Sequence, residues 1–248
     1  TMEEAVREYW TANRYLEIHS PKIIGAPTES GAEVFKIDYF DGQAFLAQSP
    51  QFYKQMAMAS GLERVFEVGP VFRAEPSFTA RHATEFTGFD AEISYIESHH
   101  DVMREHERML VAMITAITEQ HGEAIKAEFG RELAVPKAPF PEVTMAEAKK
   151  KLKQAGVASA KEGDLSPEEE RALSDLIAKE TGSEFVFVTD YPVSVRPFYH
   201  MRLKDDPKLT KSFDLLWNGV EITTGAQREH RPDVLAAQAK EKGIDPDS

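Results

Sequence analysis

The fold of this chain is decided by the stretch GPVFRAEPSFTARHATEFTGFDAEISYI, residues 69–96. Its last part, Gly88–Ile96, alternates apolar and polar side chains with the period of a half-buried β-strand. Asp90 and Glu92 therefore share the polar face of that strand. The residues expected on the apolar face are Phe89, Ala91, Ile93 and Tyr95.

The sequence just upstream predicts two more strands and a connecting loop. The strands are residues 64–68 and 70–75, divided by the breaker pair Gly69-Pro70, and the small, polar loop follows at 76–83. Arg73 and Glu75 alternate with apolar neighbours, so both face the same way. Charged side chains on strands are costly unless they are paired or lie in a cleft, which makes this face a candidate site.

Helical spacing of apolar residues predicts helices around these strands. The first runs over Glu3–Tyr15, and a second over Pro50–Ser60, with Ser49 as its N-cap and Pro50 in its first turn. A third, Asp101–Gln120, is amphipathic, and we interpret its methionine-rich stripe as core packing. Residues 43–48 form a short expected strand.

The segment 144–182 changes composition to alanine, glutamate and lysine. We expect two surface helices there, forming a small helical insertion whose runs of charge are solvated. Ser166-Pro167 resembles a helix start. Further strands are expected at 184–189 and 198–203.

A hairpin is predicted over Phe213–Gln227, because Asn218-Gly219 is the favoured two-residue type I′ turn. Antiparallel strands and helices occur together without a repeating βαβ rhythm. The predicted fold class is therefore α+β, an antiparallel sheet flanked by helices.

Composition narrows the function classes. The chain has 248 residues, a formal net charge of −13 and no cysteine, which removes disulfides and thiolate chemistry and fits a reducing compartment. Apolar runs are too short to span a membrane. The acidity disfavours a broad nucleic-acid surface but leaves room for a local basic groove. Phosphate-loop, GxGxxG and HExxH motifs are absent, and the pair His99-His100 is interpreted as surface or capping residues.

The hairpin geometry points to a cation. Regular pairing around the turn matches Leu216 with Glu221 and Asp214 with Thr223, which makes Asp214 and Glu221 diagonal neighbours on one face, roughly 7–8 Å apart or less. Two such carboxylates repel unless a cation lies between them, and oxygen ligands favour Mg²⁺. TGAQREHR, residues 224–231, adds a basic cluster able to bind a carboxylate or phosphate. The residues thus indicate a cleft for a magnesium-bound phosphate and a small carboxylate, while ordinary surface ion pairs remain the structural alternative.

The same residues carry a family resemblance. Residues 69–96 resemble motif 2 of class II aminoacyl-tRNA synthetases of subclass IIb, most closely aspartyl-tRNA synthetases of the archaeal and eukaryotic type. SPQFYKQ at 49–55 and GVEITTGAQREHR at 219–231 agree with that branch. HSPKI at 19–23 is similar to the dimer-forming motif 1, with its proline at Pro21. The resemblance covers essentially all of residues 1–248.

The resemblance implies a cytoplasmic homodimer that uses ATP and Mg²⁺ to convert L-aspartate to aspartyl-adenylate and then charges tRNA. Arg73 would hold the α-phosphate as the catalytic residue. The implied ATP ligands are Arg73, Glu75, Arg81, His82, Phe86, Asp214 and Glu221. The implied metal ligands are Asp214, Glu221 and Thr224. The implied aspartate ligands are Glu29, Gln51, Lys54, Asp90 and Arg228.

The resemblance also raises expectations about extent and alternatives. The family's motif 3 and anticodon-binding domain do not occur in the chain, so we expect a partial catalytic domain that activates aspartate poorly by itself. Charging of tRNA for asparagine as well stays open. The alternatives are a paralogue that makes an amide from the adenylate, like asparagine synthetases of related fold, and a non-catalytic dimer module.

Overall fold

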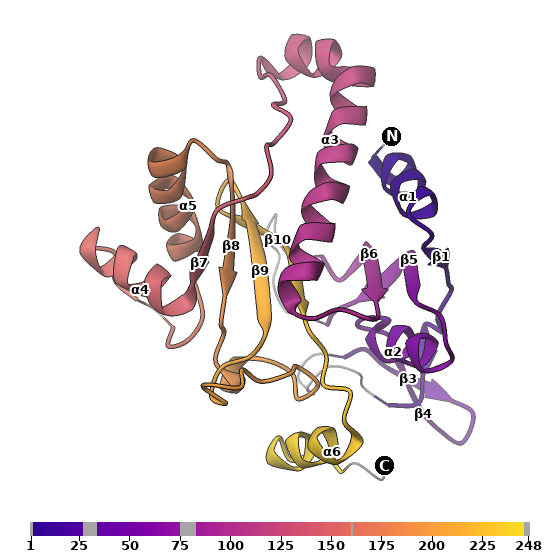
Figure 1. The fold of residues 1–248 in the computed structure, drawn as a ribbon. Helices are drawn as coiled ribbons and strands as arrows, with labels where there is room; N and C mark the ends of the chain where they lie inside the picture. The colour runs from indigo at the N-terminus through magenta and orange to yellow at the C-terminus, as the bar shows by residue number, and fades with distance from the viewer. Residues whose placement is uncertain (1, 27–33, 75–82, 160, 246–248) are drawn as a thin grey trace. The chain divides into compact units, whose positions relative to one another are not determined.

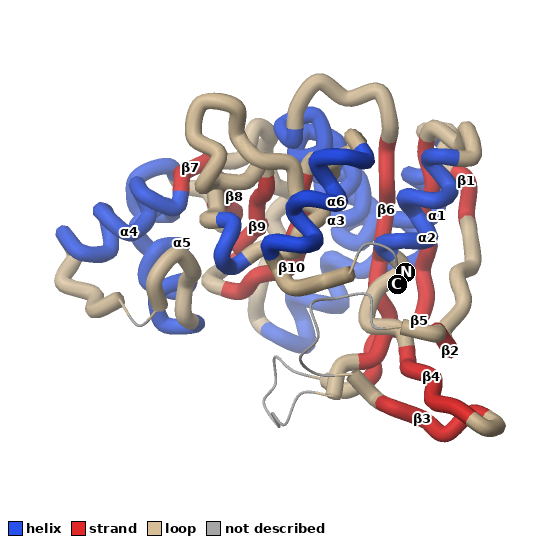
Figure 2. The backbone as a smooth tube through the Cα atoms, turned by 90° about the horizontal axis from the view of Figure 1, so that it is seen from below, coloured by secondary structure: helices blue, strands red, loops and turns tan. Residues whose placement is uncertain are grey.

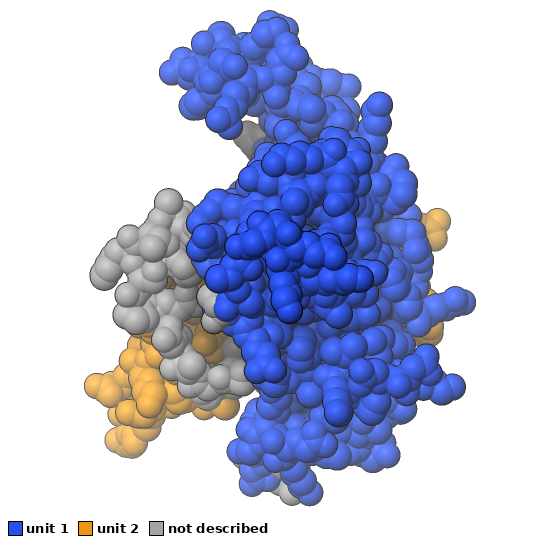
Figure 3. Space-filling model, turned by 90° about the vertical axis from the view of Figure 1, so that its left-hand side faces the viewer, with its two compact units in different colours: residues 1–5, 96–248 blue, residues 6–95 orange. Residues whose placement is uncertain are grey.

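The computed structural model describes residues 2–26, 34–74, 83–159 and 161–245. The chain divides into two compact units, which Figure 3 colours separately. Unit 1 comprises residues 1–5 and 96–248, and unit 2 comprises residues 6–95.

Unit 2 is built on two small sheets. One has the order β1-β5-β6, with β1 parallel to β5 and β5 antiparallel to β6, and the other is antiparallel with the order β2-β4-β3. The strands are β1 (Leu16–Glu17), β2 (Ile23–Ile24), β3 (Lys36–Tyr39), β4 (Gly42–Leu46), β5 (Arg64–Phe72) and β6 (Glu85–Ile93). The helices are α1 (Met2–Ala12), which begins in unit 1, and α2 (Gln51–Ala59).

Strand β5 is continuous, so the predicted division at Gly69-Pro70 is wrong. Phe72 donates its N–H to the carbonyl of Ala47 rather than to β6. Pro70 lies two residues earlier in the strand, so its backbone nitrogen points to the same side as that of Phe72, away from β6. The N–H that proline lacks therefore removes no hydrogen bond from the β5–β6 ladder. Proline is therefore tolerated within the strand.

Two further boundaries in unit 2 differ from the prediction. Strand β6 starts at Glu85 and ends at Ile93, and Tyr95 has a positive φ of 58° and is exposed, so it does not share the apolar face. Pro50 rather than Ser49 is the residue that precedes α2, but the Ser49 hydroxyl still accepts the Gln51 N–H at 3.1 Å. Ser49 is therefore not the N-cap residue as predicted, but from one position earlier its hydroxyl accepts the first N–H of the helix.

Unit 1 contains one four-stranded sheet with the order β10-β9-β8-β7, in which only β7 and β8 run parallel. Its strands are β7 (Glu142–Thr144), β8 (Phe185–Thr189), β9 (Ser212–Trp217) and β10 (Val220–Ala226). Its helices are α3 (His99–Phe129), α4 (Met145–Gln154), α5 (Pro167–Thr181) and α6 (Pro232–Glu241), with a short 3₁₀ turn at Val193–Val195 (Figure 2).

The two faces of this sheet are covered by different helices (Figure 1). Helices α4 and α5 pack on one face, where Val186, Val188 and Leu216 join their apolar side chains in a buried cluster. Helix α3 packs against β9 and β10 on the other. It extends beyond the predicted Asp101–Gln120 because a Ser98–Asp101 capping box starts it and the left-handed Gly130 ends it. The α+β class is confirmed.

The two helices predicted within 144–182 are present, but their charges are not all solvated. Each begins with a capping box, Thr144 with Glu147 and Ser166 with Glu169. Glu169 is fully buried and pairs with Lys149 at 2.6 Å. One acidic residue of the run 168–170 is therefore structural, because the helix N-terminus and a lysine both need its carboxylate.

The strand predicted at 198–203 does not form. His200 and Arg202 make only isolated bridges, to Arg228 and Thr210. His99 also differs from its interpretation as a surface residue, because it is buried in the first turn of α3. Among the described residues, no helix combines the length and apolarity needed to cross a bilayer.

Candidate functional site

The β9–β10 hairpin brings three predicted site residues to one face of the unit 1 sheet. Asn218 and Gly219 form the turn with φ of 50° and 76°, and Val220 pairs with Trp217 as predicted. The register then shifts by one between Glu221 and Thr223. Asp214 consequently pairs with Thr224, not with the predicted Thr223.

This β-bulge has a consequence for the site. Paired residues share a face, so Asp214, Thr224 and Glu221 all lie on the face covered by α4 and α5. Regular pairing would have turned Thr224 to the opposite face. The extra residue, Ile222, is what places the hydroxyl beside the carboxylates.

Arg196, which the sequence did not single out, contacts two of these residues. Its guanidinium lies 2.6 Å from Asp214 Oδ2 and 3.3 Å from Thr224 Oγ1, and its Cζ stands 3.6 Å from the centroid of the Tyr191 ring. Arg196 is separated from β9 by a loop, so no local spacing could have related it to Asp214. Only the tertiary structure identifies it.

The electrostatics of this group reflect two carboxylates held close together. Protein atoms crowd the Glu221 carboxyl although the residue has solvent-exposed surface, and this desolvation together with the Asp214 charge raises its pKa to about 8. Burial and Asp214 likewise raise the pKa of Tyr191. Asp214 Oδ1 is buried and accepts no hydrogen bond from any described residue.

These residues fit a divalent cation in their chemistry. Carboxylate and hydroxyl oxygens are the ligands that Mg²⁺ prefers, and Asp214 offers a buried oxygen without a donor. Within the described part of the chain, no group of three or more histidine, cysteine, aspartate or glutamate side chains could hold a metal by itself. A cation here would need water or substrate oxygens to complete its shell.

Arg228 is held close to the end of the same hairpin. Its Nη1 lies 2.7 Å from His200 Nε2, and its Cζ lies 5.4 Å from the Tyr199 ring centroid. Burial, followed by the charges of Arg228 and Arg196, lowers the pKa of His200 well below its usual value. A neutral His200 accepts the Arg228 N–H and orients the guanidinium.

Unit 2 brings three of the predicted aspartate ligands together, Gln51, Lys54 and Asp90, and the ammonium group of Lys54 is buried among acidic side chains. Lys54 is 3% exposed, and its Nζ lies 2.9 Å from Asp90 Oδ1 and 3.4 Å from Glu92 Oε2. Gln51 donates to Glu92 at 3.1 Å. Gln51 and Lys54 share one face of α2, and Asp90 and Glu92 share one face of β6. The sequence pattern predicts Glu92 on this face but indicates no function for it.

Arg73 follows β5, and its guanidinium stands over Phe86 with 5.4 Å between Cζ and the ring centroid. Phe86 lies in β6 opposite Val71. The two predicted ATP ligands are therefore neighbours on unit 2. Four other predicted site residues lie outside the described residues: Glu29, Glu75, Arg81 and His82.

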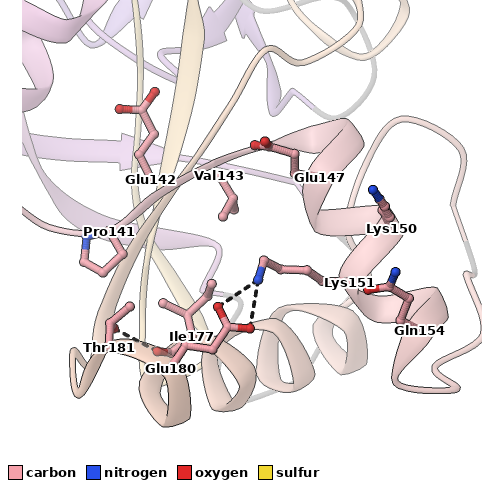
Figure 4. A pocket seen from close by; sticks show the side chains of 10 residues that line it. All are labelled: Pro141, Glu142, Val143, Glu147, Lys150, Lys151, Gln154, Ile177, Glu180 and Thr181. Carbon is pink, nitrogen blue, oxygen red and sulfur yellow. Dashed lines mark hydrogen bonds and ion pairs between the residues drawn. The ribbon is translucent and has the colours of Figure 1, made fainter.

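A separate hollow of about 520 Å³ lies between β7, α4 and α5 (Figure 4). Its floor includes Val143 and Ile177, and the ion pair of Lys151 with Glu180 spans its side. None of the predicted site residues lines it. The predicted site residues that the structure describes therefore all lie outside this hollow.

Comparison with known proteins identifies the class. The family model for class II tRNA synthetases (D, K and N) matches residues 1–248, and the chain belongs to this family. It is 46% identical over 244 residues to an aspartate–tRNA(Asp/Asn) ligase of Aeropyrum pernix, and 44% identical over 245 residues to an aspartate–tRNA(Asp) ligase of Pyrococcus abyssi. Each alignment covers 98% of this chain, but only 55% and 56% of those proteins.

Solved structures agree on the fold. An asparaginyl-tRNA synthetase from Pyrococcus horikoshii complexed with asparaginyl-adenylate superposes with a TM-score of 0.89 at 32% identity, covering 99% of this chain and 56% of that one. A putative aspartyl-tRNA synthetase from Leishmania major Friedlin superposes with a TM-score of 0.84 at 33% sequence identity. That alignment covers 98% of this chain and 54% of the other. The chain thus spans about half the length of the relatives it matches.

Proposed function

We propose that this protein is an aspartate–tRNA ligase that works in the cytoplasm, with L-aspartate, ATP and tRNA as substrates and Mg²⁺ as the metal. The observation that carries the proposal is the 46% identity to the Aeropyrum pernix ligase over nearly the whole chain. The Lys54 cluster and the Asp214–Glu221 face support it, because they supply the charges that this reaction needs.

In the first step, an α-carboxylate oxygen of aspartate attacks the α-phosphorus of ATP, and the bond to pyrophosphate breaks. The reaction needs positioning and cations near the developing negative charge rather than a general base. We assign Arg73 to the α-phosphate and Phe86 to the adenine. Asp214, Glu221 and Thr224 would hold Mg²⁺, which neutralises phosphate charge when bound. Glu75, Arg81 and His82 complete the proposed ATP site.

Lys54 and Arg228 are assigned to the side-chain carboxylate of aspartate. Asp90 would hold the α-ammonium group, with Gln51 and Glu29 completing the pocket. An asparagine side chain would present an amide NH₂ to cationic donors and leave them unpaired. A site built on polar pairing discriminates against such a mismatch by roughly 10⁴-fold.

The activity test is ATP–pyrophosphate exchange by the full chain with aspartate, asparagine and lysine in parallel. We expect aspartate to be preferred, with low absolute activity, and Arg228→Ala to abolish aspartate-dependent exchange while the thermal melting profile is kept. The matched control is Arg131→Ala, an exposed arginine beyond α3. Retained aspartate selectivity in Arg228→Ala would remove Arg228 from the pocket.

Two alternatives give different outcomes in the same assays. A paralogue that makes an amide would consume ammonia and release asparagine without charging tRNA. A non-catalytic dimer module would show no exchange with any amino acid. Charging assays with tRNA for aspartate and for asparagine would decide the tRNA range.

We also propose that residues 1–248 act as part of a synthetase catalytic domain, with residues 144–182 as a helical insertion, and that the protein is a homodimer formed through the region of Pro21. The match of the family model over all 248 residues supports the first point. The apolar exposure near Pro21 in unit 2, at Leu16 and Ile23, supports the second.

A further inference from the structure

Arg196 is a cation that the chain supplies to its own carboxylate pair. Its side chain is 13% exposed, that of Asp214 is 7% exposed, and their closest atoms are 2.6 Å apart. The second guanidinium nitrogen reaches Thr224 at 3.3 Å. A single guanidinium thus bridges two of the three residues proposed for the metal.

The local structure holds this guanidinium in place. Arg196 precedes Pro197 and has the extended backbone that a residue before proline favours, with φ of −118° and ψ of 152°. Its planar group lies on the Tyr191 ring, which is itself buried. The Tyr191 carbonyl accepts hydrogen bonds from the N–H and the hydroxyl of Thr210, both at 2.9 Å. Arg196 is therefore a fixed charge rather than a mobile surface side chain.

The charge balance explains what such a cation does. Asp214 and Glu221, when ionised, present two negative charges to a divalent ion, and Arg196 reduces this to a net charge of −1. Asp214 keeps one oxygen, Oδ1, without a donor among the described residues. A divalent ion can still use that oxygen, but it is repelled by a guanidinium on the neighbouring one. A triphosphate would bring the negative charge that Arg196 has cancelled.

We propose that Arg196 is a specificity-determining residue that weakens the binding of divalent cations alone, so that the site takes up Mg²⁺ together with a nucleoside triphosphate. The inference rests on the proposed function for the identity of the nucleotide. The Arg196–Asp214 and Arg196–Thr224 contacts within unit 1 place the positive charge beside the proposed metal ligands. Arg196 acts in cation selection and not in the chemical step.

The test is Mn²⁺ titration of the full chain without nucleotide, followed by electron paramagnetic resonance of the unbound ion, since Mn²⁺ shares the oxygen ligands of Mg²⁺. Arg196→Gln should bind Mn²⁺ roughly tenfold or more tightly than the wild type, because a unit charge a few ångströms away is removed. Arg196→Lys keeps the charge and should stay within about threefold of the wild type. Adding Asp214→Asn to Arg196→Gln should abolish the gained affinity.

Arg202→Gln is the matched control, because Arg202 pairs with Glu241 in the same unit but contacts none of the proposed metal ligands. Thermal melts check folding, and Arg196→Met, which keeps packing over Tyr191, replaces the glutamine variant if that one does not fold. Equal Mn²⁺ affinity in wild type and folded variant, or the same gain in Arg202→Gln, would overturn the inference. Absence of aspartate exchange would instead contradict the proposed function and leave this result standing.

Discussion

At the residue scale, several charged and titratable side chains of this protein are buried, and their charges are balanced in different ways. Lys54 is buried and pairs with Asp90 and Glu92, since an ammonium group removed from water needs opposite charge close by. Arg196 is likewise largely buried and pairs with the Asp214 carboxylate. His99 differs from both, because neither ring nitrogen has a hydrogen-bond partner among the described residues. Its ring lies against that of His100, with 4.2 Å between the ring centroids and a tilt of 39°. It is therefore buried as a neutral imidazole.

This burial predicts an acid-sensitive stability. Desolvation, together with the charges of His100 and Lys211, lowers the pKa of His99 to about 4, so below pH 6.5 the unfolded chain takes up a proton that the folded chain does not. The free energy of unfolding should therefore fall as the pH drops from 6.5 towards 4. At pH 5 the loss due to His99 should be about 2 kcal/mol. The His99→Leu variant lacks this loss. In denaturant titrations, its free energy of unfolding relative to wild type should therefore rise by about 2 kcal/mol when the pH is lowered from about 7.5 to about 5.

The control for this pH effect is His121→Leu on the same helix, because His121 is exposed. It should leave the pH dependence unchanged. Parallel pH profiles of His99→Leu and wild type would show that His99 does not carry the effect.

At the scale of elements, capping and turn chemistry determine where the helices and strands of unit 1 begin and end. Three helices start with capping boxes, and the hairpin turns at Asn218-Gly219. In α5 the capping glutamate is also the buried partner of Lys149, so one residue links the start of α5 to α4. In β10, the bulge at Ile222 determines which residues face the site, because it turns Thr224 towards Asp214.

The dual role of Glu169 predicts a position-specific loss of stability within a run of three glutamates. Glu169→Ala removes the cap contact to Ser166 and leaves Lys149 without its buried carboxylate, which should cost about 3 kcal/mol of unfolding free energy. The neighbouring Glu168→Ala is the control, because Glu168 is exposed and contributes only to the helix dipole, at below about 1 kcal/mol. Equal losses in urea denaturation of the two variants would refute the structural role of Glu169.

For the whole molecule, exposed apolar side chains of unit 2 bear on assembly. Leu16 and Ile23 are 52% and 53% exposed, and they flank Pro21 in the sequence. A homodimer would bury such residues and would tie folding to protein concentration.

We therefore expect the melting temperature to rise with protein concentration, and Ile23→Asp to give a monomer in analytical ultracentrifugation. Phe129→Asp is the control, because Phe129 is an exposed apolar residue of unit 1 and should leave the dimer intact. A wild-type chain that sediments as a monomer at all concentrations would contradict the proposed dimer.

Much of the fold could be predicted because the deciding signals are local. The Asn218-Gly219 turn, the capping residues and the alternation of β6 depend on backbone geometry within a few residues. The predictions that were wrong depend on distant partners. Gly69-Pro70 remains within a strand because Pro70 pairs with Thr87 of β6 while its nitrogen, which has no hydrogen to donate, faces away from β6. Residues 198–203 form no strand, and His200 and Arg202 make isolated bridges to Arg228 and Thr210 instead.

The candidate site divides in the same way. The sequence by itself determined the family, the α+β class and the types of residue available for binding carboxylate, phosphate and metal, because motif spacing and hairpin pairing are properties of the chain order. Only the tertiary structure decided that a bulge turns Thr224 towards Asp214, that Glu92 lies beside Lys54, and that Arg196 packs on the Tyr191 ring and pairs with Asp214. Those relations depend on packing between segments far apart in sequence, where burial and charge pairing select the partner.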